Sequence, residues 1–145
     1  MDEAAYRRTR EQANTLPCVF QGALQARCAR CELVAKRSLA EREMLACTRP
    51  TAHLNCETLL NLFHERATFP LRLHPGAPLT HATELRLQSG GLLGLQKALA
   101  AAEADVHQMV QQAQSLYGSL TDLPWTQIVE CIKAWQPRRR AAPKP

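Results

Sequence analysis

Apolar residues recur every three or four positions along most of this chain, which is the spacing of amphipathic helices. One such face lies in residues 50–69: Ala52, Cys56, Leu59, Leu60, Phe63 and Ala67. A second has near-heptad spacing and ends at Gly118: Leu92, Leu95, Leu99, Val106, Met109, Val110, Ala113, Leu116 and Tyr117. A third precedes Pro137: Trp125, Ile128, Val129, Ile132 and Trp135. No stretch of convincing length alternates in the manner of a strand, so we predict helices throughout.

Proline and glycine divide this helical pattern into segments. Pro50 opens one helix, and residues 70–80 hold three prolines and a glycine, which makes them the longest predicted loop. A further helix begins near His81 and is interrupted by Gly90 and Gly91. Either the helix kinks there, or another backbone or a bound group approaches closely, and close helix packing is the simpler interpretation.

The stretch 18–47 also predicts helix, because it contains one glycine, Gly22, and no proline. Unbroken, it would run about 45 Å at 1.5 Å per residue, which is long for a chain of this size. Ser38 followed by Glu41 has the spacing of a capping box, so a break near Arg37 and Ser38 would fold the stretch into a helical hairpin. The sequence leaves both options open.

Together these segments predict an all-α fold. It is an irregular bundle of five or six helices in a single domain over residues 1–136, with a disordered basic tail at 137–145. Residues 2–14 supply a polar first helix. A chain of 145 residues fits one domain, and 46% hydrophobic with 21% charged residues is ordinary for a soluble globular protein. This composition excludes a wholly disordered chain.

The formal charge of +5 is concentrated in the tail, where Arg138, Arg139, Arg140 and Lys144 supply four cations. Such a tail is either a solvated terminus or an arm that contacts an acidic protein, an anionic lipid or a nucleic acid. Nucleic acid is disfavoured, because no helix is studded with Arg and Asn and no aromatic stacking platform is present. We therefore expect a protein partner.

Hydropathy points neither to a membrane nor to export. No run approaches the roughly 18 apolar residues needed to span a bilayer. Residues 1–12 are charged and lack the apolar core of a secretory signal. We therefore expect a cytoplasmic protein in a reducing environment, where structural disulfides are rare. Its six cysteines are then free, metal-bound or redox-active.

Five of the six cysteines fall within residues 18–56, while Cys131 stands apart and carries no assigned role. Cys28 and Cys31 form a CxxC pair. On a helix, positions three apart share one face with Cβ atoms about 5–6 Å apart, so both sulfurs could bind one metal. The pair is therefore the starting point of the predicted site.

Two more ligands must come from other segments. A turn near Ser38 and Leu39 would bring Cys47 level with Cys31, because the two cysteines are symmetric about it. A bend near Gly22 would allow an earlier cysteine to join them. We therefore predict a metal site with four ligands: Cys18, Cys28, Cys31 and Cys47.

Four thiolates suit zinc or an iron–sulfur cluster. Zinc ribbons use two close ligand pairs, whereas single cysteines on separate helices favour a cluster such as [4Fe–4S]. Cys56 competes with Cys18 or Cys47 for a ligand position. Two alternatives stay open. The cysteines could be small core residues, or Cys28 and Cys31 could be a redox-active dithiol, although no strand precedes them as in thioredoxin-like proteins.

Motifs for hydrolysis or nucleotide binding are absent: there is no GxSxG, HExxH or Walker loop. We therefore do not expect an enzyme acting alone. The expected function is that of a small cytoplasmic iron–sulfur protein, an accessory or electron-transfer protein that acts with a larger enzyme. The alternative is a metal-free helical adaptor whose cysteines lie in the core and whose last helix and tail bind a protein partner.

Overall fold

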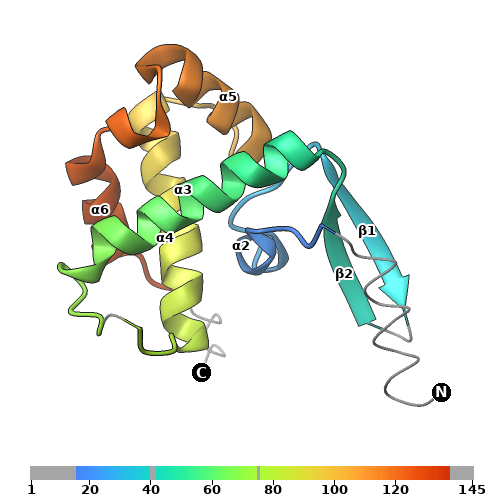
Figure 1. Cartoon of the computed structure of the whole chain (residues 1–145), viewed down its shortest axis with the longest axis horizontal. Helices are drawn as coiled ribbons and strands as arrows, with labels where there is room; N and C mark the ends of the chain where they lie inside the picture. Colours follow the sequence, from blue (N-terminus) through green and yellow to red (C-terminus); the bar gives the residue numbers. More distant parts are fainter. Residues whose placement is uncertain (1–15, 40–41, 75, 138–145) are drawn as a thin grey trace, which may run out of the picture.

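The computed structural model describes residues 16–39, 42–74 and 76–137. The elements in chain order are α2 (Gln21–Gln25), β1 (Val34–Leu39), β2 (Arg42–Cys47), α3 (Pro50–Thr68), α4 (His81–Leu99), α5 (Val106–Tyr117), the 3-10 helix η1 (Leu120–Asp122) and α6 (Trp125–Ala134). The hairpin of β1 and β2 lies on the opposite side of the molecule from α6, and α3 runs between them (Figure 1).

Helix α4 lies at the centre of the helical part and contacts α2, α3, α5 and α6. Its first turn is capped, because the Thr83 N–H donates to the Thr80 hydroxyl at 3.1 Å. Glu84 in the first turn and Lys97 in the last turn complement the helix dipole. Most of its residues between Leu87 and Leu95 are buried, so this helix provides much of the core.

Glycines let the backbones of neighbouring helices approach α4. A Cβ atom at Gly94 would lie 2.8 Å from the Ile128 Cα, and one at Gly90 would lie 2.8 Å from the Ile132 Cα, both on α6. Helix α4 continues through Gly90 and Gly91 without a break, so the interruption predicted there is wrong. Close packing, the simpler interpretation of these glycines, accounts for them.

Three aromatic rings link the cysteine-bearing segment to the helical part. Phe20 packs against Phe63 with ring centroids 6.0 Å apart, and Phe63 meets Trp125 edge-on at 5.9 Å. Phe20 and Phe63 are fully buried. The core is therefore one continuous cluster that includes residues of α2, α3 and α6.

The predicted helix that spans Leu92 to Tyr117 is in fact two helices. Helix α4 ends at Leu99, where Ala100 adopts a left-handed conformation with φ of 51°. Helix α5 starts after Asp105, whose carboxylate accepts the Gln108 N–H at 3.1 Å. The heptad pattern hid this break, because Leu99 and Val106 are seven residues apart and stay in phase on either side of it.

The predicted all-α fold is wrong, because residues 34–47 form an antiparallel β-hairpin rather than helix. Val34 pairs with Cys47 at its open end, and Leu39 pairs with Arg42 at its turn. Of the predicted helix 18–47, the described part is helical between Gln21 and Gln25. The other described helices belong to an irregular bundle, so the fold is α-helical with a two-stranded sheet.

Long-range backbone pairing explains why helix-forming residues adopt strands here. The Cys18 N–H donates to the Leu45 carbonyl at 2.9 Å, and the Cys47 N–H donates to the Leu16 carbonyl at 2.7 Å. Strand β2 is thus paired along both edges, and Met44, Leu45 and Ala46 are all buried. Burial on both faces removes the alternating pattern by which a strand is detected.

The predicted helix at 2–14 and all but the first residue of the predicted tail lie outside the described residues. Within the part of the chain that the structure describes, each helix is too short or too polar to cross a bilayer.

Candidate metal centre

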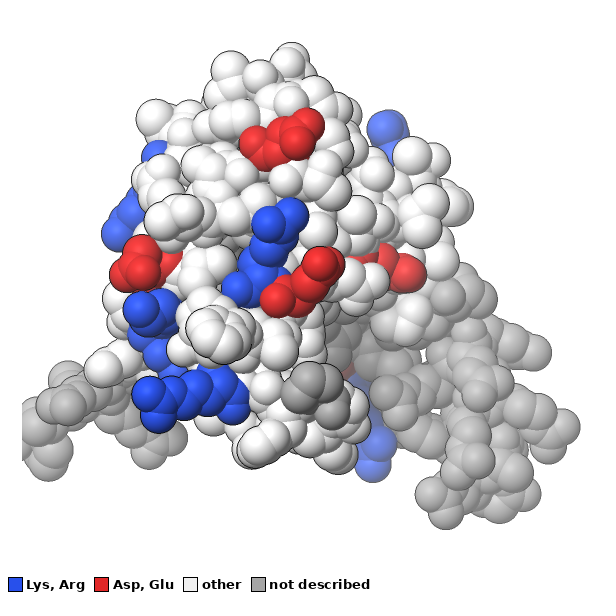
Figure 2. All heavy atoms as spheres, turned by 60° about the vertical axis from the view of Figure 1, so that its left-hand side comes forward, with Lys and Arg blue, Asp and Glu red and all other residues white. Residues whose placement is uncertain are grey.

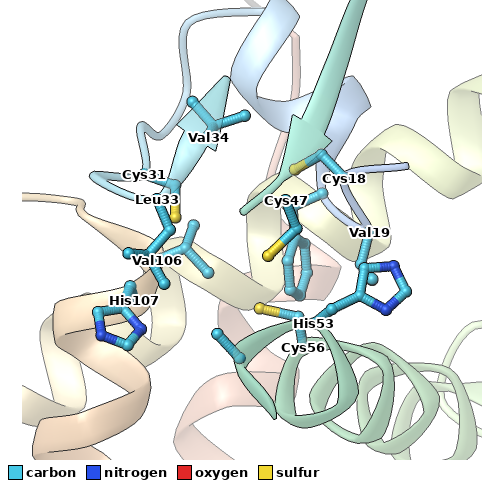
Figure 3. Close-up of a pocket in the computed structure, with 12 residues that line it drawn as sticks. Cys18, Val19, Cys31, Leu33, Val34, Cys47, His53, Cys56, Val106 and His107 are labelled. Carbon is cyan, nitrogen blue, oxygen red and sulfur yellow. The ribbon is translucent and has the colours of Figure 1, made fainter. Parts of the chain in front are cut away.

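Four of the six cysteines line one small cavity between the hairpin, α3 and the start of α5. The cavity has a volume of about 20 Å³, and Cys18, Cys31, Cys47 and Cys56 contribute to its wall. Their sulfur atoms point toward the same space (Figure 3). The remaining wall is mainly apolar: Val19, Phe20, Leu33, Val34, Ala52 and Val106, with His53 and His107.

The backbone of β2 places two of these cysteines. Cys18 lies beside β2, because its N–H donates to the Leu45 carbonyl at 2.9 Å, and Pro17 forms an antiparallel bridge with Ala46. Cys47 is the last residue of β2. Strand β2 therefore positions both cysteines: Cys18 is hydrogen-bonded along its edge, and Cys47 is its last residue.

Cys31 lies in the turn that leads into β1, and that turn is tied to the loop before α5. The Arg30 N–H donates to the Ala104 carbonyl at 3.0 Å, and the Val106 N–H donates to the Arg30 carbonyl at 2.8 Å. The hairpin brings Cys31 beside Cys47, since Val34 is paired with Cys47. The chain does reverse between these two cysteines, but the predicted turn residues Ser38 and Leu39 lie in β1, and the reversal falls between Leu39 and Arg42, flanked by strands rather than helices.

Cys56 is the fourth cysteine of the cavity and comes from the second turn of α3. Cys28, which the sequence placed among the ligands, lies elsewhere. It lines a different cavity with Ser89 and Trp135, and its thiol is 3.8 Å from the Ala26 carbonyl. The CxxC pair lies in a turn, not on a helix, so its two side chains do not share a face.

Burial raises the pKa of three of the four thiols and so favours their protonated form. Removal from water raises the pKa of Cys18 from 9.0 to about 11 and that of Cys56 to about 12. Burial likewise raises the pKa of Cys31. Repulsion between the thiolates adds to each shift: Cys56 is affected by Cys31, Cys18 and Cys47. This mutual influence places the four sulfurs within electrostatic reach of one another.

Helix α3 directs its positive end toward this cavity. The helix begins at Pro50, no side chain caps it, and no acidic residue occupies its first turn. Cys47 lies just before the helix, and Cys56 lies in its second turn. The N-terminal end of a helix stabilises nearby negative charge by about 0.3–1 kcal/mol. It would therefore favour an anionic centre held by thiolates.

Two histidines beside the cavity were not singled out by the sequence. The His53 Nε2–H donates to the Pro17 carbonyl at 2.9 Å, and His53 Nδ1 lies 2.9 Å from the Glu57 carboxylate. His53 thereby ties the residue before Cys18 to the helix that carries Cys56. The i, i+3 spacing of His53 and Cys56 on one helix face was the available signal for this arrangement.

Among the described residues, no group of three or more Cys, His, Asp or Glu side chains is arranged to hold a metal ion as the side chains stand. The four thiols instead surround a space. Comparison with protein-family models, curated proteins and solved structures found no match to this chain. The cavity must therefore be interpreted from its own residues.

Proposed function

We propose that this chain binds an iron–sulfur cluster of the [4Fe–4S] type and acts as an accessory or electron-transfer protein for a larger enzyme. The proposed ligands are four: Cys18, Cys31, Cys47 and Cys56. One observation carries the proposal. Cysteines from four separate segments line a single, largely apolar cavity.

Core packing alone is a poor explanation for this arrangement. Cysteine is a small side chain that fills a core well, but an empty space among packed side chains destabilises a protein. Here four thiols surround a cavity of about 20 Å³, larger than the roughly 10–15 Å³ that one water needs. A bound cation between the sulfurs would occupy this space and would offset the repulsion that the ionised thiols would exert on one another.

The spacing of the ligands, not the size of the cavity, favours a cluster over a single zinc ion. Structural zinc sites typically take their ligands as two close pairs, whereas the four cysteines here come from four separate segments of the chain. A cavity of about 20 Å³ holds about one water, so the cysteines would have to move apart to admit the iron and sulfide of a cluster.

The surroundings suit a cluster that exchanges electrons. Apolar neighbours such as Phe20 and Val106 limit the access of water, and solvent exposure is one factor that sets the potential of a cluster. The four cysteines are nevertheless half-buried, so a cluster would lie close to the surface. Thiolate ligation also agrees with a reducing compartment, for which we propose the cytoplasm.

The proposal is tested by purifying the full chain without oxygen and measuring iron, acid-labile sulfide and visible absorption. We expect iron and sulfide in equal amounts and a broad charge-transfer absorption. Serine replacements at Cys18, Cys31, Cys47 and Cys56 should each reduce cluster content severely. Cys28→Ser and Cys131→Ser are matched controls outside the cavity, and they should retain the cluster.

Three outcomes would contradict the proposal. Zinc at one equivalent without iron would identify a single-ion site. Equal loss of iron in Cys28→Ser and Cys56→Ser would reject the ligand set. Absence of any metal, with thiols that react only after denaturation, would favour the metal-free adaptor whose cysteines are core residues.

A further inference from the structure

A second hollow lies on the other side of Cys31. This groove has a volume of about 470 Å³ and lies between the turn after α2 and the β-hairpin. Apolar side chains of Leu24, Val34 and Leu45 line it together with Cys31. Because Cys31 also lines the four-cysteine cavity, one ligand side chain separates the groove from the proposed cluster.

Three cations line this groove: Arg27, Arg30 and Lys36. Arg30 is paired with Glu103, and Lys36 lies 3.9 Å from Glu43, but the side chains of both pairs are more than half exposed. Exposed ion pairs contribute about 0–1 kcal/mol, so an incoming carboxylate can replace them at little cost.

Arg27 adds an unpaired charge and a conformational cost. Its guanidinium forms no hydrogen bond or ion pair with the other described residues, and its φ is 60°, in the left-handed region. This conformation closes α2, where the Cys28 N–H donates to the Ala23 carbonyl at 2.9 Å. Glycine is the usual residue at such a position, and a residue with a side chain is strained there by about 1–2 kcal/mol. The Arg27 side chain is exposed and lines the groove, so its charge is available to an anionic group that binds there.

Charge is also divided unevenly along the chain. Residues 18–56 contain six Lys or Arg and three Glu. Residues 57–137 contain five Lys or Arg and seven Asp or Glu. The face that carries α6 shows both signs interspersed with wide uncharged areas (Figure 2). The cysteine-bearing part is therefore the more basic part of the folded chain.

We propose that this groove docks an acidic segment of a protein partner and thereby brings that partner up against Cys31. Carboxylates would meet Arg27, Arg30 and Lys36, and an apolar residue would fit the lining of Leu24, Val34 and Leu45. The role of this contact in electron exchange rests on the proposed function. The binding itself does not, because the cations and the apolar side chains that would contact the segment are not metal ligands, although the ligand Cys31 also lines the groove.

The test uses the full chain and a fluorescein-labelled oligoglutamate peptide, titrated by fluorescence anisotropy at low ionic strength. Arg27→Glu combined with Lys36→Glu should weaken binding at least about tenfold, because attraction becomes repulsion at the groove. Arg72→Glu combined with Lys97→Glu changes the net charge equally at two exposed sites away from the groove. That control should weaken binding less than about twofold.

The basic C-terminal segment is a competing site, so a third variant replaces Arg138, Arg139 and Arg140 with Gln. It should leave most of the peptide affinity in place. Equal weakening in the groove and control variants would overturn the proposal. So would loss confined to the C-terminal variant, or absence of binding to the unmodified chain. If the groove variant fails to fold, as judged by circular dichroism, Arg27→Gln with Lys36→Gln replaces it and should weaken binding about threefold.

Iron content is measured in the same preparations, so the two proposals fail separately. Peptide binding without metal would retain the groove and reject the cluster. Metal binding without peptide affinity would reject the groove and retain the cluster.

Discussion

The two ends of this molecule are stabilised in different ways. Around α4 and α6, helix backbones meet through glycines, and a Cβ at Gly94 would lie 2.8 Å from the Ile128 Cα. Around the hairpin, backbone pairing between distant segments surrounds a cavity lined by four thiols. The first region is closely packed, whereas the second surrounds a cavity with half-buried thiols. Packing accounts for the helical end, and the proposed cluster would account for the arrangement of cysteines at the other.

Removal of the proposed cluster should have the largest effect, and that effect should be confined to the cysteine end of the molecule. In the cluster-bound chain we expect the hairpin and the segment around Cys18 to be protected from hydrogen exchange. Without the cluster, protection there should fall at least about tenfold, because the thiolates lose their common ligand. Amides of α4 and α6 should change little. An equal loss of protection in both regions would contradict the division.

Gly94→Ala should instead damage the helical end. The added methyl group meets the backbone of α6, which cannot rotate away, and overpacking of this kind costs about 1–3 kcal/mol. Urea denaturation measures this change. Gly22→Ala is the matched control, because its Cβ would approach the Gln88 side chain at 3.1 Å rather than a backbone.

That control should lose less than about 1 kcal/mol, since the Gln88 side chain can move. Iron content should be unchanged in Gly94→Ala, because α4 does not line the four-cysteine cavity. A large loss of iron in this variant would show that the two ends are more strongly coupled than we infer.

Alkaline pH should weaken the cysteine end of the metal-free chain. The pKa of Cys18 is about 11 and that of Cys56 about 12 in the folded chain, against 9.0 in the unfolded chain. The unfolded chain therefore loses these protons at lower pH than the folded chain. The contribution of the two thiols to the free energy of unfolding is fully present below pH 9 and declines as the pH rises toward 12. Urea midpoints at about pH 8 and about pH 10.5 measure the decline.

Cys18→Ala with Cys56→Ala should show a smaller decline over this range, and Cys131→Ala should behave like the unmodified chain. The same shifts predict that metal uptake at neutral pH releases protons from Cys18, Cys31 and Cys56. Proton release is measured by calorimetry in buffers of different ionisation enthalpy. A metal affinity independent of pH would contradict the raised pKa values.

The sequence predicted the helical end better than the cysteine end, for a physical reason. The apolar faces of α3 and α6 depend on local spacing, and Thr80 caps α4 as its residue type favours. The hairpin depends on hydrogen bonds to residues 16–18, and the residue pattern within the hairpin cannot predict this long-range pairing. Helix-forming residues such as Ala35 and Glu43 occupy its strands, so tertiary pairing overrides their local preference.

The candidate site was predicted in part for the same reason. The sequence alone indicated that the cysteines cluster and that the chain reverses between Cys31 and Cys47. It did not indicate that Cys56 lines the cavity and Cys28 does not, because the position of Cys28 depends on the turn at Arg27. The left-handed conformation at Arg27 ends α2 and turns the CxxC pair out of helical geometry. Sequence rules expect glycine at such a position, and none is present.

The smallest expected effect comes from placing glycine at the two left-handed positions that follow α2 and α4. One position lies near each end of the molecule, so the pair compares the two ends. Arg27→Gly and Ala100→Gly should each relieve strain, because their φ values are 60° and 51°. We expect each to raise the free energy of unfolding by up to about 1 kcal/mol, measured in urea. Arg27→Gly should also weaken binding of the oligoglutamate peptide about twofold, because one cation of the groove is lost, while Ala100→Gly leaves this binding unchanged. A gain in stability without loss of peptide affinity at Arg27 would mean that its side chain has no part in the groove.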